Sequence, residues 1–85
     1  MTRFTVRLQP SAERALTKLS REIQARILAK LEQLAENPYP PGAEKMQGEP
    51  GYRVRVGDYR IVYDVLREQV TVLVIRIGHR REVYR

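Results

Sequence analysis

The sequence predicts an α+β fold, a two-layer sandwich in which a helical hairpin covers one face of a β-sheet. Three features indicate this fold. A short alternating segment opens the chain, two stretches with helical apolar spacing follow, and three alternating segments make up the second half. The 85 residues contain no repeat, and a chain this short cannot hold two separate cores, so we expect a single domain, residues 1–85.

The first elements are a strand and a short helix. Residues 4–8 alternate apolar and polar side chains, which is typical of a half-buried strand. Pro10 is expected to end this strand, and Ser11 is a suitable N-cap for a helix. Apolar residues at helical spacing then continue to Leu19. The N-terminal strand is expected to join the same sheet as the strands of the second half.

A second helix follows, with Ser20 as its expected N-cap. Isoleucine and leucine residues form one apolar stripe along it: Ile23, Ile27, Leu31 and Leu34. Asn37 ends the helix, because a residue before proline is pushed out of helical geometry. Residues 38–51 are rich in proline and glycine and are expected to form a loop.

Three strands are predicted in the second half, at residues 52–56, 59–66 and 70–77. Short turns join them, first Gly57-Asp58 and then residues 67–69. Turns of this length favour antiparallel hairpins, so the three strands should form an antiparallel meander.

Charge gives the first indication of function. The chain carries 16 basic and 10 acidic residues, a net charge of +6, and its pI is near 10.2. Residues 1–51 have a net charge of +2, and residues 52–85 have a net charge of +4 in which every base is arginine. Arginine presents a planar fork of donors that matches phosphate oxygens, whereas lysine is a point charge. A polyanionic partner is therefore indicated, and a merely soluble surface is the alternative.

The segment 52–65, YRVRVGDYRIVYDV, contains the main candidate site. If its valines face the helices, Arg53 and Arg55 share the other face of a strand. They would stand about 7 Å apart, close to the spacing of consecutive phosphates in an extended single strand. Arg60 lies on the paired strand, where the hairpin could bring it beside them. Neighbouring arginines repel, so the cluster suits a bound anion; a solvated sheet edge is the alternative.

The C-terminal segment 76–85, RIGHRREVYR, is the second candidate element. It contains the only histidine, His79, within a cationic run. Nearby arginines would favour the ionised form of Tyr84, which could then take or give a proton. A structural histidine and a hydrophobic plug at the terminus are the alternative interpretations of these two residues.

Several chemistries are excluded. One histidine and no cysteine do not provide the usual zinc ligand sets, and no paired acidic motif suggests a two-metal nuclease. No glycine-rich phosphate loop precedes a helix. We therefore expect neither metal nor cofactor. No signal-peptide core or run of about 20 apolar residues is present, which predicts a soluble cytoplasmic protein without a membrane partner.

The motifs YRVRVGDYRIVYDV and GHRREVYR, preceded by KMQG at residues 45–48, resemble the RelE branch of the RelE/ParE toxin superfamily. The resemblance covers essentially the whole chain. It implies the toxin of a type II toxin–antitoxin pair, which enters the ribosomal A site and cleaves mRNA there. In that family the 2′-hydroxyl of the RNA attacks the neighbouring phosphate and leaves a 2′,3′-cyclic phosphate and a 5′-hydroxyl.

Basic residues hold the phosphate in that family, and a C-terminal tyrosine orients or helps to activate the nucleotide. The positions of this chain that match are Arg53, Arg55, Arg60, Arg80 and Tyr84. His79, where some relatives place a lysine and others a histidine, is an added catalytic candidate. We further expect contacts to RNA or the ribosome from other basic residues: Lys45, Arg76, Arg81 and Arg85.

The family often has lysine where this chain has Arg53 and Arg55, and one such lysine is a candidate general base there. Arginine cannot give up its proton in a protein. The base here would have to be Tyr84 or His79, or else the reaction relies on charge neutralisation and in-line positioning.

Two other functions of the superfamily stay open. One is a ParE-like toxin that poisons DNA gyrase, a branch that usually lacks an arginine ladder together with a terminal tyrosine. The other is an inactive member that only binds its antitoxin or operator DNA. The basic surface predicts an acidic, partly disordered, RelB-like antitoxin that folds on it. The ribosome, with its mRNA and rRNA, is the other expected partner, and a toxin–antitoxin hetero-oligomer could bind operator DNA.

Overall fold

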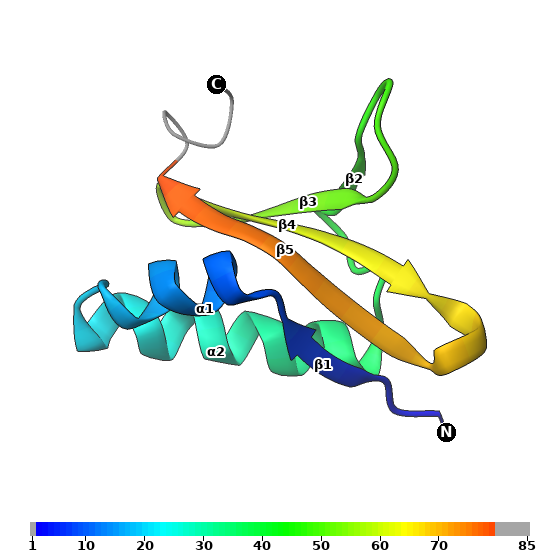
Figure 1. Ribbon diagram of the computed structural model, residues 1–85, viewed down its shortest axis with the longest axis horizontal. Helices are drawn as coiled ribbons and strands as arrows, with labels where there is room; N and C mark the ends of the chain where they lie inside the picture. The colour runs from blue at the N-terminus through cyan, green and yellow to red at the C-terminus, as the bar shows by residue number, and fades with distance from the viewer. Residues whose placement is uncertain (1, 80–85) are drawn as a thin grey trace.

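The computed structural model describes residues 2–79. Its elements are β1 (Thr5–Leu8), α1 (Pro10–Thr17), α2 (Arg21–Glu36), β2 (Glu44–Lys45), β3 (Tyr52–Val56), β4 (Tyr59–Leu66), the 3₁₀ turn η1 (Arg67–Gln69) and β5 (Thr71–His79). The five strands form one sheet in the order β1-β5-β4-β3-β2. β1 runs parallel to β5, and all other neighbours are antiparallel. Both helices lie on the same side of this sheet (Figure 1), so the predicted α+β sandwich is confirmed.

The hydrophobic core lies between the helices and the sheet. On α2, Ile27, Leu31 and Leu34 recur every three or four residues and are all buried. The central strands bury mainly alternate residues: Val54, Val56, Ile61, Tyr63, Val72, Val74 and Ile77. Because these residues determine which face of each strand meets the helices, they also determine where the residues between them point.

The N-cap residues of the two helices contradict one prediction and confirm another. Ser11 is not an N-cap: α1 begins at Pro10 with Gln9 as N-cap, and the Ser11 hydroxyl donates to the Ile75 carbonyl at 3.4 Å. Proline suits the first helical turn because the amide hydrogen that it lacks would have no partner there. Ser20 caps α2 as predicted, since its hydroxyl accepts a hydrogen bond from the Ile23 amide at 3.3 Å.

The segment 38–51 is not entirely a loop, contrary to the prediction. Residues 44 and 45 form β2, a two-residue strand that pairs with β3 at the edge of the sheet. The start of the segment is held by the buried Tyr63, whose hydroxyl donates to the Pro38 carbonyl at 2.6 Å. The segment thus adds a fifth strand to the sheet.

Candidate nucleic-acid interface

The register of β3 against β4 separates the arginines from the core. Val54 lies opposite Ile61, and both are buried against the helices. Arg55, one residue after Val54, lies directly opposite Arg60, one residue before Ile61, so both arginines are on the other face. We call this side of the sheet, opposite the helices, the open face. Directly opposite residues have Cβ atoms about 4.5–5.5 Å apart, so the two guanidinium groups leave the sheet from adjoining positions.

A β-bulge in β5 brings another arginine to the open face. Val74 points into the core, and strict alternation would send Arg76 the same way. The pairing with β4 skips Ile75, which restores the alternation one residue later. Arg76 consequently lies opposite Val62, which in turn lies opposite Arg53. The two arginines flank Val62 at about 10 Å across two strand spacings.

The open face is positively charged around these arginines, and a carboxylate moderates the charge at one edge. Glu44 of β2 lies opposite Arg53, and its Oε2 is 3.3 Å from Nη2 of that arginine. The Nε atoms of Arg53 and Arg60 are shielded from solvent, whereas Arg55 and Arg76 are exposed. Arginine stays charged at any pH that a folded protein tolerates. A phosphodiester placed here would offset the mutual repulsion of these cations.

His79 is not brought together with the arginines. β5 continues to His79, two residues past its predicted end, and His79 pairs with Tyr59. The Tyr59 ring packs against the core and meets the imidazole edge to face, with 5.6 Å between ring centroids. His79 also alternates with the buried Ile77. It therefore lies on the helix side of the sheet.

The other predicted contact residues fall into two groups. Lys45 lies on β2 and, with Glu44 and Arg53 among others, lines a hollow of about 280 Å³ at the sheet edge. The remaining predicted residues lie outside the described part of the chain: Arg80, Arg81, Tyr84 and Arg85. Sequence reasoning missed Glu44 as the partner of Arg53, because two residues in a glycine- and proline-rich stretch show no strand periodicity.

Residues 2–79 contain no group of three or more histidine, cysteine, aspartate or glutamate side chains that could hold a metal ion. Nor is either helix in this range long and apolar enough to cross a bilayer.

Burial raises the pKa of Tyr63 to about 12, and the neighbouring Tyr52 and Tyr39 add to the rise. The Tyr63 phenol therefore stays protonated near neutral pH. Its role is to pack in the core and donate to the Pro38 carbonyl, not to transfer protons.

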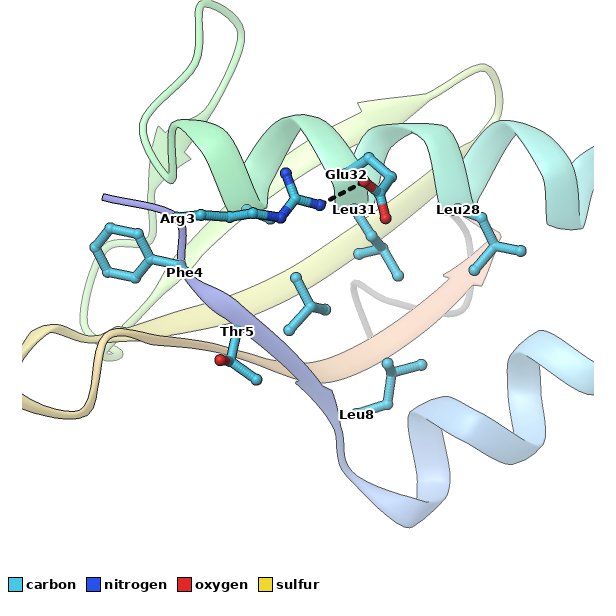
Figure 2. A pocket seen from close by; sticks show the side chains of 9 residues that line it. Arg3, Phe4, Thr5, Leu8, Leu28, Leu31 and Glu32 are labelled. Atoms are coloured by element: carbon cyan, nitrogen blue, oxygen red, sulfur yellow. Dashed lines mark hydrogen bonds and ion pairs between the residues drawn. The ribbon is translucent and has the colours of Figure 1, made fainter. Parts of the chain in front are cut away.

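A groove between β1 and α2 is built from other elements than the arginine cluster. It has a volume of about 590 Å³ and is lined largely by apolar side chains, including Phe4, Leu8 and the half-exposed Leu28 (Figure 2). Arg3 lies on its rim and is paired with Glu32. Because the cation in its lining already has a carboxylate partner, this groove does not extend the candidate interface.

Comparisons of the sequence with known proteins indicate one superfamily of toxins. Residues 6–84 match the family model described as the ParE toxin of the type II toxin–antitoxin system parDE. Toxin RelG of Mycobacterium tuberculosis is 32% identical over 84 residues, which cover 96% of this chain and 97% of the relative. The mRNA interferase toxin RelE of Escherichia coli K12 is 38% identical over 80 residues, which cover 85% of this chain and 83% of the relative.

A solved structure shows the same fold. The toxin–antitoxin complex RelBE2 of Mycobacterium tuberculosis contains a chain that superposes with a TM-score of 0.81 at 29% identity. The match covers 91% of this chain and 98% of that chain. The family match, the two relatives and the shared fold show that the chain belongs to the RelE/ParE superfamily of type II toxin–antitoxin toxins, as a member of the RelE type.

Proposed function

We propose that this toxin is an endoribonuclease that cuts mRNA in the ribosomal A site without a metal ion and so inhibits translation. The observation that carries the assignment is the register that sets Arg55 opposite Arg60 and adds Arg53 and Arg76 to the same face. Guanidinium groups on neighbouring strands match the non-bridging oxygens of a phosphodiester. A relative of this chain, RelE of Escherichia coli K12, is named an mRNA interferase toxin.

In the proposed reaction the 2′-hydroxyl oxygen of the RNA attacks the adjacent phosphorus. The O2′–P bond forms and the P–O5′ bond breaks, which leaves a 2′,3′-cyclic phosphate and a 5′-hydroxyl. Negative charge grows on the non-bridging oxygens in the transition state, where preorganised guanidinium donors bind it more strongly than in the ground state. Loss of one donor of this kind typically slows a reaction by about 10²–10³.

Two proton transfers accompany this step, since the 2′-hydroxyl loses a proton and the 5′-oxygen gains one. Arginine cannot serve as the base. His79 lies on the helix side of the sheet, which leaves Tyr84 as the preferred candidate of the two. We propose that Tyr84 and Arg80 complete the site, and that further basic residues contact RNA or the ribosome: Lys45, Arg81 and Arg85.

The proposed cognate partner is an acidic, partly disordered antitoxin of the RelB kind. RelE of Escherichia coli and RelBE2 of Mycobacterium tuberculosis are relatives solved as toxin–antitoxin complexes. The net charge of +6 favours an acidic segment that folds on the toxin. We expect the toxin to act in the cytoplasm and, with its antitoxin, to form a hetero-oligomer on operator DNA.

The alternative is poisoning of DNA gyrase, which is favoured by the description of the matching family model as a ParE toxin. The two functions damage different polymers, RNA in one case and DNA in the other. An assay that offers both polymers therefore separates them.

The test combines two reactions with the purified protein. Ribosomes programmed with a defined mRNA should yield cut mRNA with a 2′,3′-cyclic phosphate at the upstream fragment's end, mapped by primer extension and end analysis. Gyrase with plasmid DNA should supercoil normally in the same protein's presence. Intact mRNA combined with cleaved plasmid would establish the gyrase alternative. Intact mRNA and intact plasmid, with antitoxin binding retained, would identify an inactive member.

A further inference from the structure

The edge of the sheet beside Arg53 has a polar hollow that phosphate binding does not explain. The hollow has a volume of about 280 Å³ and is lined by Glu44 and Lys45 of β2, Met46 and Gln47 of the following loop, and Arg53 of β3. Pockets for drug-sized ligands have volumes of about 300–1,000 Å³, so this hollow suits a smaller group. In Figure 1 the connection between β2 and β3 rises from the sheet on the side away from the helices. The hollow therefore adjoins the open face.

Glu44 places a carboxylate next to the arginines of the open face. Its Oε2 is 3.3 Å from Nη2 of Arg53, and its side chain is 62% exposed. Ion pairs with this exposure contribute little to stability, so the fold does not require the pair. A carboxylate also repels an approaching phosphate, which weakens a surface that binds only the RNA backbone. A ligand that donates hydrogen bonds to Glu44 would explain its presence.

The pair with Arg53 leaves Glu44 able to accept further hydrogen bonds. A carboxylate has two oxygens with about four acceptor sites in total. Arg53 donates to Oε2, and Oε1 can accept from a ligand in the hollow. Because Glu44 and Arg53 are directly opposite each other on paired strands, the ion pair also fixes the direction of the carboxylate.

The loop between β2 and β3 gives the hollow a fixed wall. Met46 is half-buried and contributes a polarisable sulfur, which makes favourable contacts with aromatic rings. Gln47 is exposed and can both donate and accept. The Met46 amide donates to the Gly51 carbonyl at 3.1 Å, and a Cβ at Gly51 would lie 2.7 Å from the Tyr63 carbonyl oxygen. Both ends of the loop are thus held against the sheet, and the second end requires glycine.

We propose that this hollow, formed by Glu44, Met46, Gln47 and Arg53, is a nucleobase subsite that selects the RNA base beside the bound phosphate. Glu44 accepts a hydrogen bond from the exocyclic amino group of cytosine, adenine or guanine, as acidic side chains do with the cytosine amino group in DNA. Uracil has no amino group, and the carboxylate repels its carbonyl oxygens. The subsite rests on the proposed function, because it binds the strand whose phosphate the arginines hold.

The subsite and the arginines of the open face can bind one RNA strand together. Proteins recognise RNA sequence mostly in single strands, whose bases turn away from one another and present their edges. Arg53 lines the hollow and lies on the same face as Arg55, so a phosphate on these arginines brings its neighbouring base to the β2 edge. A site that accepts a hydrogen bond discriminates against a ligand that cannot donate one. Glu44 therefore gives the toxin a preference for particular positions in an mRNA.

The test measures base preference in variants that lose the same charge. Glu44→Gln removes the carboxylate from the hollow, and Glu49→Gln removes an exposed carboxylate of the loop outside the lining. The proteins are titrated with labelled oligocytidylate and oligouridylate of equal length, 2′-O-methylated so that they cannot be cut. Wild type and Glu49→Gln should bind the cytidine oligomer about tenfold more tightly than the uridine oligomer. Glu44→Gln should reduce this ratio to about twofold or less, because an amide can also donate to uracil.

The ratio of the two affinities separates base selection from charge, since loss of one carboxylate tightens the binding of both oligomers. An unchanged ratio in Glu44→Gln would overturn the subsite and leave Glu44 as a counter-charge of Arg53. A wild type that binds the two oligomers equally, or binds neither, would overturn it too. Gln47→Ala keeps the charge and should lower the ratio from the loop side; if Glu44→Gln does not fold, an unchanged ratio in Gln47→Ala decides against the subsite.

Cleavage is measured separately, on programmed ribosomes. A wild type that prefers the cytidine oligomer and cuts no mRNA would refute the nuclease and support the subsite. Cleavage by a wild type without base preference would refute the subsite alone.

Discussion

The two faces of the sheet are formed by the same strands, but one face buries apolar side chains and the other carries arginines. The helix face buries Val54, Ile61 and Ile77, and each such side chain contributes about 1.5–3 kcal/mol through burial. The open face sets Arg55 directly opposite Arg60, an arrangement that costs up to about 1 kcal/mol. Stability and proposed activity are therefore separable, because neighbouring residues of one strand serve different faces.

Substitutions at two neighbouring residues of β4 test whether stability and proposed activity depend on different faces of the sheet. Arg60→Ala should slow mRNA cleavage by about 10²–10³, because the charged transition state then has one donor fewer. Its melting temperature should stay close to that of wild type, because Arg60 lies on the open face and outside the core. Single-turnover cleavage on programmed ribosomes and thermal unfolding provide the two measurements. A cleavage rate within threefold of wild type would remove Arg60 from the site.

The next residue along the strand should show the reverse pattern. Ile61 is fully buried, so Ile61→Ala should lower the free energy of unfolding by about 2–5 kcal/mol. The fraction that remains folded should cleave mRNA at the wild-type rate. Urea denaturation and activity per folded molecule are compared with those of Arg60→Ala. A similar loss of stability in both variants would show that the faces are not separable.

The buried phenol of the helix face predicts a response to alkaline pH. The pKa of Tyr63 is about 12 in the folded chain and 10.0 for an unperturbed tyrosine, so the folded state holds this proton more tightly. The resulting stability is present below pH 10 and is lost as the pH rises through 12, a change of about 2.7 kcal/mol.

Tyr63→Phe should remove most of this dependence. The variant also lacks the hydrogen bond to the Pro38 carbonyl, which lowers its stability by about 1 kcal/mol near neutral pH, where the wild-type phenol is protonated. Denaturant midpoints from pH 9 to 12 should therefore fall more steeply for wild type than for the variant. Parallel slopes for the two proteins would place the phenol in contact with solvent.

The smallest expected effect tests the repulsion on the open face. Arg55→Ala should raise the free energy of unfolding by a few tenths of a kcal/mol, because it relieves the repulsion with Arg60. The gain should shrink as salt screens the charges. Inorganic phosphate should raise the melting temperature of wild type more than that of the variant. A variant less stable than wild type at low salt would show that the pair is not strained.

The sequence alone determined the elements that depend on neighbours along the chain. The turn at Gly57-Asp58 and the alternation of residues 52–65 predicted the β3–β4 hairpin and placed Arg53, Arg55 and Arg60 on one face. The same alternation also predicts the face on which His79 lies, because it shares that face with Ile77 two residues earlier. That inference was missed because the strand was expected to end at Ile77 rather than at His79.

Only the tertiary structure decided the features that depend on distant partners. β1 pairs in parallel with β5, and the two residues of β2 become a strand because β3 offers them an edge. Skipping Ile75 lets β5 bury both Val74 and Ile77 while Arg76 reaches the open face. Local pattern cannot specify such choices, because a one-residue shift in register reverses every side chain, and packing against α2 and β4 selects among the registers.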